Sequence, residues 1–260
     1  MRYFKATIEY DGTDFCGYQW QHGLRTVQGV LEKAIEVRTE QVVRIEGAGR
    51  TDSGVHSLGQ VIGFNCETRI PGESMVLALN SVLPGDVVVK KVEEVSPTFR
   101  ARFSASSRSY AYLIFNRQTP SALWSRYSAF CPVPLDVAAM QKAANFLLGE
   151  QDFAAFANDL DREKVTMRDV MSCRVRRQHD FVIVRVEANA FLRGMVRNIV
   201  GTLMEVGVGK RTLDSIPKVL ASCDRRLAGP TAPPQGLCLL KVGYGERKNY
   251  AHWKERDTER

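Results

Sequence analysis

Polar and apolar residues alternate along several short segments of the chain, a pattern typical of half-buried β-strands. At the start, Phe4, Ala6 and Ile8 would share one side of a strand, with mostly polar residues on the other side. The same period of two recurs around Tyr110. The pattern predicts strands at residues 1–10, 42–46, 55–64, 87–95, within 102–116, and at 173–175, 181–188 and 237–244.

Other segments place an apolar residue every three or four positions, which indicates helices with one buried side. The first has Thr26 before it, a residue whose hydroxyl can accept a hydrogen bond from the first helical turn. The last has Leu192, Met195 and Ile199 on its apolar side. The pattern predicts helices at residues 26–38, 74–80, 137–148 and 191–206.

Strands and helices mixed along one chain, with long connections, predict an α/β fold in the broad sense. We expect two similar halves, at residues 1–104 and 105–245. Residues 246–260 are dense in mixed charge and are expected to form a surface tail.

Composition narrows the class of protein. The chain has 260 residues, of which 44% are hydrophobic, so it can bury a substantial core. Lysine and arginine number 36 against 29 acidic residues, a formal charge of +7. A basic protein suits a polyanionic partner, although ordinary surface charge gives the same balance.

Several chemistries lack their usual sequence patterns. The six cysteines and four histidines are scattered and form no C-x-x-C pair, so we expect no zinc site, no other metal and no disulfide framework. Asp52 stands where a dinucleotide fingerprint needs its third glycine, and Arg211 stands where a phosphate-binding loop needs serine or threonine, so we expect no nucleotide cofactor. The N-terminus has no signal-peptide core and no apolar run reaches membrane-spanning length, so we expect a soluble, cytoplasmic protein.

The stretch GAGRTDSGVH, residues 47–56, combines three glycines with Arg50, Asp52 and His56. Asp52 has two interpretations. Its carboxylate could stabilise a turn by binding nearby backbone amides, or it could carry chemistry. Arg50 is near enough in sequence to pair with a carboxylate or a phosphate, and the glycines allow a bulky ligand to approach the backbone.

Residues 49–56, GRTDSGVH, resemble the signature of the tRNA pseudouridine synthase A family. Further blocks resemble that family in the same order, and together they span residues 1–244. They are YDGTDFCGYQWQ and RTVQGVLEKAI within residues 10–35, LNSVLPGDVVV at 79–89, FRARFSASSRSYAYLI at 99–114, NAFLRGMVRNIVGTLMEVG at 189–207 and GPTAPPQGLCLLKV at 229–242.

The resemblance implies that the chain isomerises uridine to pseudouridine at nucleotides 38, 39 and 40 of tRNA, without a cofactor and as a homodimer. It also implies two duplicated halves that are similar to RNA-recognition folds, joined in a mostly antiparallel mixed sheet with the catalytic cleft between them. Asp52 would be the catalytic nucleophile.

Further site residues are also implied by the resemblance. Tyr110 would stack on the target uracil and help to remove its C5 proton, Arg197 would pair with Asp52, and Leu237 would form an apolar wall. Arg50 is a candidate for flipping the base or binding a phosphate. From the residues alone, Tyr110 is better interpreted as an alternating strand aromatic, Arg197 could belong to a solvated basic stripe, and Leu237 could be a core residue.

Two positions depart from the resemblance, because Arg100 and Gln235 stand where the family often has histidine. Five basic residues are candidates for holding the tRNA backbone: Arg100, Arg102, Arg108, Arg193 and Lys210. Two alternatives stay open, a non-catalytic tRNA-binding or folding protein and the same chemistry on another RNA. The atom that Asp52 attacks is also open.

Overall fold

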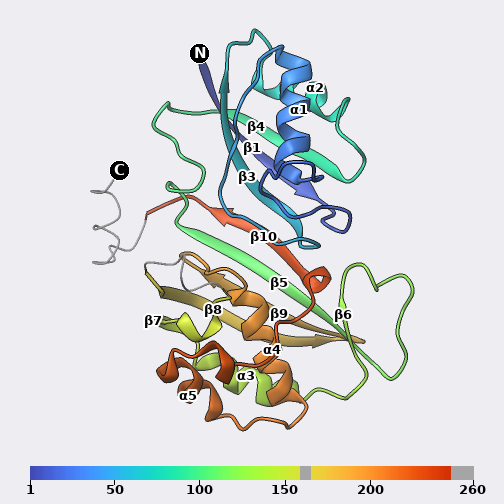
Figure 1. The fold of residues 1–260 in the computed structure, drawn as a ribbon, viewed down its shortest axis with the longest axis vertical. Coiled ribbons are helices and arrows are strands. Elements are labelled where there is room, and N and C mark those ends of the chain that lie inside the picture. Colours follow the sequence, from blue (N-terminus) through green and yellow to red (C-terminus); the bar gives the residue numbers. More distant parts are fainter. Residues whose placement is uncertain (159–164, 247–260) are drawn as a thin grey trace.

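The protein is described by a computed structural model that covers residues 1–158 and 165–246, so residues 247–260 of the predicted tail lie outside the described residues. In this part of the chain, ten strands form one mixed, mostly antiparallel sheet in the order β4-β1-β3-β10-β5-β9-β8-β7, with β2 paired to β3 and β6 to β5 (Figure 1). The strands are β1 (Arg2–Tyr10), β2 (Glu46–Gly47), β3 (His56–Cys66), β4 (Val87–Glu94), β5 (Ser107–Asn116), β6 (Ala129–Cys131), β7 (Gly149–Asp152), β8 (Met167–Gln178), β9 (Phe181–Ala188) and β10 (Leu237–Gly243).

The helices form two groups beside this sheet (Figure 1). Helix α1 begins as predicted, because the Thr26 hydroxyl accepts a hydrogen bond from the Gly29 amide at 3.3 Å. The helices are α1 (Val27–Thr39), α2 (Gly72–Asn80), α3 (Val137–Asn145), α4 (Met195–Gly207) and α5 (Ser215–Ser222), with short 3-10 turns at Ala154–Phe156, Arg225–Leu227 and Pro234–Gly236.

The core consists of two clusters of buried hydrophobic side chains. One draws on residues 4–92 and joins β1, β3 and β4 to α1 and α2. The other draws on residues 48–242 and joins β5, β8 and β9 to α3, α4 and α5. The α/β fold class is confirmed, whereas the division into halves at residue 105 stays a prediction.

Strand β10 connects the two parts of the sheet, although it is the last strand among the described residues. It runs parallel to β3, with Cys238 opposite His56 and Leu239 opposite Ser57. On its other edge it runs antiparallel to β5, with Leu239 opposite Tyr110. The start of β10 therefore lies beside the end of the loop that contains Asp52.

The predicted strand at residues 42–46 is wrong, because only Glu46 and Gly47 pair with β3. Val43 and Ile45 are buried, but they belong to the cluster that contains α1. The Ile45 amide donates to the Glu32 carboxylate on that helix at 3.1 Å. Packing against a helix therefore produced the alternation that resembles a strand.

Other boundaries also differ from the predictions. Strand β8 is much longer than the predicted 173–175, and α3 ends at Asn145 rather than at residue 148. Helix α4 begins four residues later than predicted, because Gly194 before it has a positive φ of 74°. Strands β6 and β7 and helix α5 were not predicted.

Helix α4 lies so close to the segment that precedes β10 that one position has no room for a side chain. A Cβ atom at Gly201 would lie 1.7 Å from the Pro230 carbonyl oxygen. The same segment is bonded to the helix by the Gly229 amide, which donates to the Thr202 hydroxyl at 2.8 Å. This contact fixes α4 against the chain that leads into the site.

We expect Gly201→Ala to destabilise the protein by about 2 kcal/mol or more, because the backbone contact with Pro230 must open. Helix propensity alone predicts the opposite sign, a gain of about 1 kcal/mol. The free energy of unfolding in urea measures the effect. Gly85→Ala is the control, since a Cβ atom there meets nothing within 4 Å. Equal stability of the two variants would contradict the close contact.

Candidate active site

The loop between β2 and β3 is a turn held on several sides. The Val55 amide donates to the Asp52 carbonyl at 3.2 Å, and Gly54 completes the turn with a φ of 77°. The Thr51 carbonyl accepts from the Tyr18 amide at 3.0 Å, and the Ser53 hydroxyl donates to the Phe15 carbonyl at 2.9 Å. These bonds fix the backbone of Asp52 without using its carboxylate, so the carboxylate is left for another partner.

That partner is Arg197 on α4, 145 residues away in sequence. Its Nη1 lies 2.8 Å from Asp52 Oδ2. Its Nε donates to the Ala232 carbonyl at 2.7 Å, and its own carbonyl accepts from the Ala232 amide at 3.1 Å. The Arg197 side chain is 17% exposed and that of Asp52 is 32% exposed. A half-buried guanidinium therefore faces a carboxylate that solvent and ligands can still reach.

Arg108 also binds the loop that contains Asp52, and its position shows that one prediction is wrong. It is buried and was expected to be among the residues that hold the tRNA backbone. Its guanidinium instead donates to carbonyl oxygens, including those of Ala48 at 2.9 Å, Asn189 at 2.8 Å and Arg102 at 2.7 Å. Arg108 thus anchors the loop, because a buried guanidinium is stable only when its donors are satisfied.

Tyr110 belongs to β5 and lies next to the loop that contains Asp52. Its ring meets Phe191 edge-on, with centroids 5.2 Å apart and an interplanar angle of 89°. Burial raises the pKa of Tyr110, and the nearby Asp52 charge adds to the rise. The phenol is therefore protonated at neutral pH.

The remaining predicted site residues lie in different environments. Leu237 is buried at the start of β10, opposite Tyr112 of β5. Arg50 is exposed and, within the described residues, has no ion-pair partner, so its nearness in sequence to Asp52 does not produce a pair. Arg100 is exposed and pairs with Glu46 at 3.2 Å. The exposed basic residues Arg102, Arg193 and Lys210 stay candidates for RNA contact.

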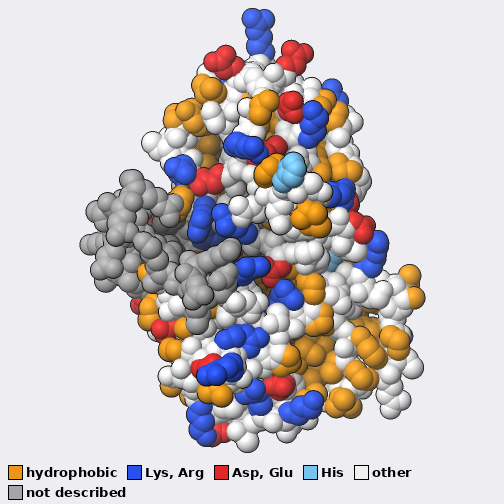
Figure 2. Space-filling model, in the orientation of Figure 1, with side chains coloured by type: hydrophobic (Ala, Val, Ile, Leu, Met, Phe, Trp, Pro, Cys, Tyr) orange, Lys and Arg blue, Asp and Glu red, His pale blue; other side chains and the backbone are white. Residues whose placement is uncertain are grey.

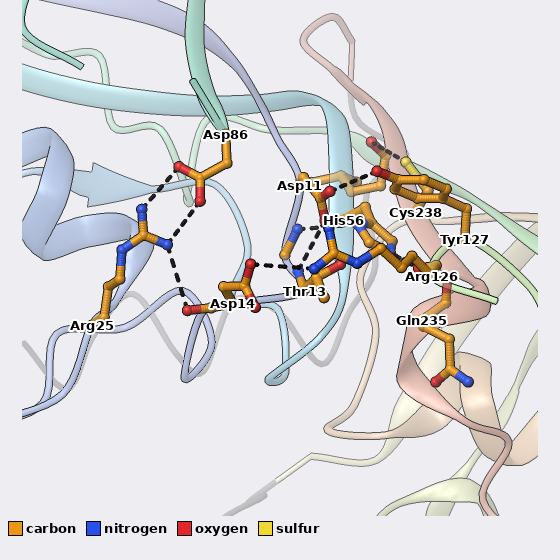
Figure 3. Close-up of polar contacts among 12 residues, drawn as sticks. Asp11, Thr13, Asp14, Arg25, His56, Asp86, Arg126, Tyr127, Gln235 and Cys238 are labelled. Carbon is orange, nitrogen blue, oxygen red and sulfur yellow. Dashed lines mark hydrogen bonds and ion pairs between the residues drawn. The ribbon is translucent and has the colours of Figure 1, made fainter. Parts of the chain in front are cut away.

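His56 is a supporting residue of the same motif to which the sequence assigned no role (Figure 3). Its Nδ1 accepts from the Gly12 amide at 3.0 Å, so the ring proton lies on Nε2, which faces the carbonyls of Arg126 and Gln235 at 3.0 and 3.2 Å. Asp11 Oδ1 also lies 3.1 Å from Nδ1, but the amide already occupies that nitrogen. His56 therefore joins three segments, and only its place within the motif could have drawn attention to it.

No three or more histidine, cysteine, aspartate or glutamate side chains in the described part of the chain are grouped as metal ligands would be. No helix there has both the length and the apolar character that a membrane span requires.

The fold and the site define an α/β protein with one reachable loop carboxylate, a helix-borne arginine paired to it and a buried tyrosine from a central strand. The model of the tRNA pseudouridine synthase family matches residues 6–104 and 143–245. The chain belongs to this family.

Curated relatives named tRNA pseudouridine synthase A are similar over nearly the whole chain. The one from Thermoanaerobacter sp. (strain X514) is 45% identical, covering 94% of this chain and all of that protein. The one from Methylococcus capsulatus is 45% identical, covering 92% and 88%. The one from Colwellia psychrerythraea is 42% identical, covering 95% of each.

We expect Arg197→Gln to lower kcat by about 100-fold or more, because the Asp52 carboxylate loses the charged partner that fixes its direction. Arg197→Lys should recover only part of this loss, since one ammonium group cannot bind Asp52 and the Ala232 carbonyl in the same geometry. Steady-state kinetics with tRNA measures both variants. Lys218→Gln, at an exposed position on α5, is the control. Full activity of Arg197→Gln would show that the pair has no part in the reaction.

The buried tyrosines predict a loss of stability at alkaline pH. Burial raises the pKa of Tyr10 from 10.0 to about 12 and raises that of Tyr110 further. Both phenols stabilise the fold fully below pH 10, and this stability is lost as pH rises through the folded pKa values, because the unfolded chain ionises first. At pH 11 each should cost about 1.4 kcal/mol.

Urea unfolding from pH 9 to 11 measures this loss, and Tyr10→Phe and Tyr110→Phe should each reduce it. Absorbance at 295 nm checks the cause. If both phenols ionised near pH 10 while the protein stayed folded, the burial argument would be wrong.

Proposed function

We propose that this protein isomerises uridine to pseudouridine in the anticodon stem-loop of tRNA, at nucleotides 38, 39 and 40. The observation that carries the proposal is the Asp52 carboxylate, held 2.8 Å from Arg197 and still 32% exposed, in a chain that belongs to the tRNA pseudouridine synthase family. The curated relatives support the same activity through their names, because each is called a tRNA pseudouridine synthase A.

The reaction moves one bond and conserves every heavy atom. The bond between ribose C1′ and uracil N1 breaks, the base turns, and C1′ bonds to C5. The hydrogen on C5 leaves as a proton and N1 gains one. The sum is redox-neutral and needs no energy donor, so the side chains of this chain are sufficient in principle.

Asp52 is assigned the role of nucleophile. Breaking a glycosidic bond develops positive charge on the sugar, and a nearby carboxylate stabilises or captures that charge. Arg197 supports this role by fixing the direction of the carboxylate through its second bond to Ala232. Attack on C1′, attack on C6 and removal of a sugar proton all begin from this arrangement.

The target base must leave its stack to reach Asp52. We assign Tyr110 to stacking on the uracil and Leu237 to the apolar wall beside it, since both belong to the hydrophobic cluster beneath the loop. Because the Tyr110 phenol is protonated, removing the C5 proton through it requires a second group that takes the phenolic proton. Exposed Arg50, on the loop itself, is assigned to phosphate contact during flipping.

The tRNA body needs a wider surface than this loop. Exposed Arg100, Arg102, Arg193 and Lys210 are assigned to its phosphates, and such contacts read shape more than sequence. The site would lie where the predicted halves, residues 1–104 and 105–245, meet. We further propose a cytoplasmic homodimer in which one subunit grips the tRNA while the other modifies it.

Asp52→Asn should lower the rate of pseudouridine formation by about a thousandfold or more, because an amide is a poor nucleophile. It should change tRNA affinity by less than about twofold, because Asp52 is not one of the residues assigned to phosphates and no phosphate contact is lost. Tritium release from C5-labelled uridine in a tRNA transcript measures the rate, and filter binding measures affinity.

Asp214→Asn, which changes an exposed carboxylate just before α5 that pairs with Lys218, is the matched control. Mapping pseudouridine in the product then identifies the nucleotides. A wild-type rate with Asp52→Asn would leave a tRNA-binding protein as the better account. Product at nucleotides other than 38–40 would refute the site of modification alone.

A further inference from the structure

The C-terminal strands of the sheet have one face covered by helices and one face free of them. Val182, Val184 and Val186 of β9 are buried in the cluster that contains α3 and α4. Because side chains alternate along a strand, Ile183 and Arg185 project from the opposite face. The register with β5 and β8 extends this alternation, and we call the helix-free face of β5, β9 and β8 the outer face.

Three exposed arginines lie together on the outer face. Arg174 of β8 is the register partner of Arg185 of β9, and Arg176 follows two residues later. We call these three residues the arginine ladder. Within the described part of the chain no carboxylate forms an ion pair with them, and neighbouring Glu187 accepts a hydrogen bond from Ser107 at 2.9 Å. Like charges placed opposite each other destabilise a sheet, so this arrangement suits an external anion better than it suits folding.

A hollow of about 430 Å³ borders the ladder. Ile183, the register partner of Arg176, belongs to its lining. Trp124 is 43% exposed and meets Phe181 edge-on at 5.0 Å. Figure 2 shows hydrophobic side chains gathered at the lower right, where Figure 1 places the loop between β5 and β6 that carries Trp124. The apolar lining consists of Leu113, Phe115, Trp124, Phe181 and Ile183.

We propose that the outer face is a second RNA-binding surface, on which the arginine ladder holds phosphates of an unpaired stretch of RNA and the hollow takes one of its bases. The proposal rests on the proposed function and extends it, because Asp52 and Arg197 lie on the helix-covered face. Single-stranded nucleic acids bind where a basic track runs beside aromatic rings, since phosphates need cations and every base has a stacking face.

The charges beside the hollow favour RNA over a second copy of the chain. Arg117 and Asp180 line the hollow as an ion pair at 3.5 Å, with the Arg117 guanidinium 4.6 Å from the Phe115 ring centroid. The excess positive charge therefore comes from the arginine ladder next to the hollow. Protein interfaces are depleted of charge at their centre, whereas nucleic-acid surfaces combine cations with rings. The hollow also falls within the range of about 300–1,000 Å³ that small ligands occupy, which is sufficient for a base and its sugar.

The test uses the full-length protein with two probes, an unmodified tRNA transcript and a single-stranded RNA oligonucleotide. Fluorescence anisotropy over a series of salt concentrations gives affinity and its salt dependence. Arg174→Gln combined with Arg185→Gln should weaken binding of both probes about tenfold and reduce the slope of log affinity against log salt by about 1.4, since each phosphate contact on a single strand contributes about 0.7. For catalysis, KM should rise while kcat stays unchanged.

Trp124→Ala tests the hollow, and oligonucleotide affinity should fall about tenfold through lost stacking. Trp124→Phe keeps a stacking ring and should retain most of the affinity, so the comparison separates stacking from damage to the loop. Lys33→Gln combined with Lys218→Gln is the matched control, because it removes the same charge from exposed positions on α1 and α5.

The proposal would be overturned if the ladder variant had the same affinity and the same salt slope as the control. A change of oligomeric state in light scattering, with oligonucleotide binding unaltered, would overturn it too, and would assign the outer face to a second copy of the chain. Oligonucleotide binding needs no catalysis. A chain that binds through the ladder but makes no pseudouridine would therefore refute the proposed function alone.

Discussion

The position of the Asp52 carboxylate depends on how Arg197 is held at its other edge. The guanidinium is a rigid planar fork, so the bond from Nε to the Ala232 carbonyl sets the direction in which Nη1 points. The Ala232 amide returns a bond to the Arg197 carbonyl, which ties the whole residue to one short segment. The Arg197 side chain is thereby held in one orientation, and this fixes the position of the Asp52 carboxylate.

Strand β10 explains why these distant residues meet. By lying between β3 and β5, it brings the segment around Ala232 next to the loop before β3, and sets Leu239 beside Tyr110. Buried Arg108 links the two parts of the sheet, because its guanidinium donates to the Ala48 and Asn189 carbonyls. The site is therefore a property of the sheet order, since its members belong to no single segment.

Periodicity was sufficient for elements whose burial follows from their own sheet or helix, such as β1, α1 and β9. It failed at Val43 and Ile45, which are buried by α1, and at the start of β8, where the buried polar residues Arg168 and Asp169 break the alternation. The family resemblance implied the pairing of Asp52 with Arg197, which the structure shows at 2.8 Å. Nearness in sequence favoured Arg50 as a partner, and charge favoured Arg108 as a surface residue. Both expectations failed because long-range contacts decide where a side chain points.

The same sheet order determines when the protein can begin to work. Chains emerge from the ribosome with the N-terminus first. Asp52 is made early, but the Ala232 carbonyl that orients its partner and the strand that joins β3 to β5 are among the last described parts of the chain. A partly synthesised chain therefore contains the Asp52 carboxylate before the contacts that fix its partner Arg197 can form.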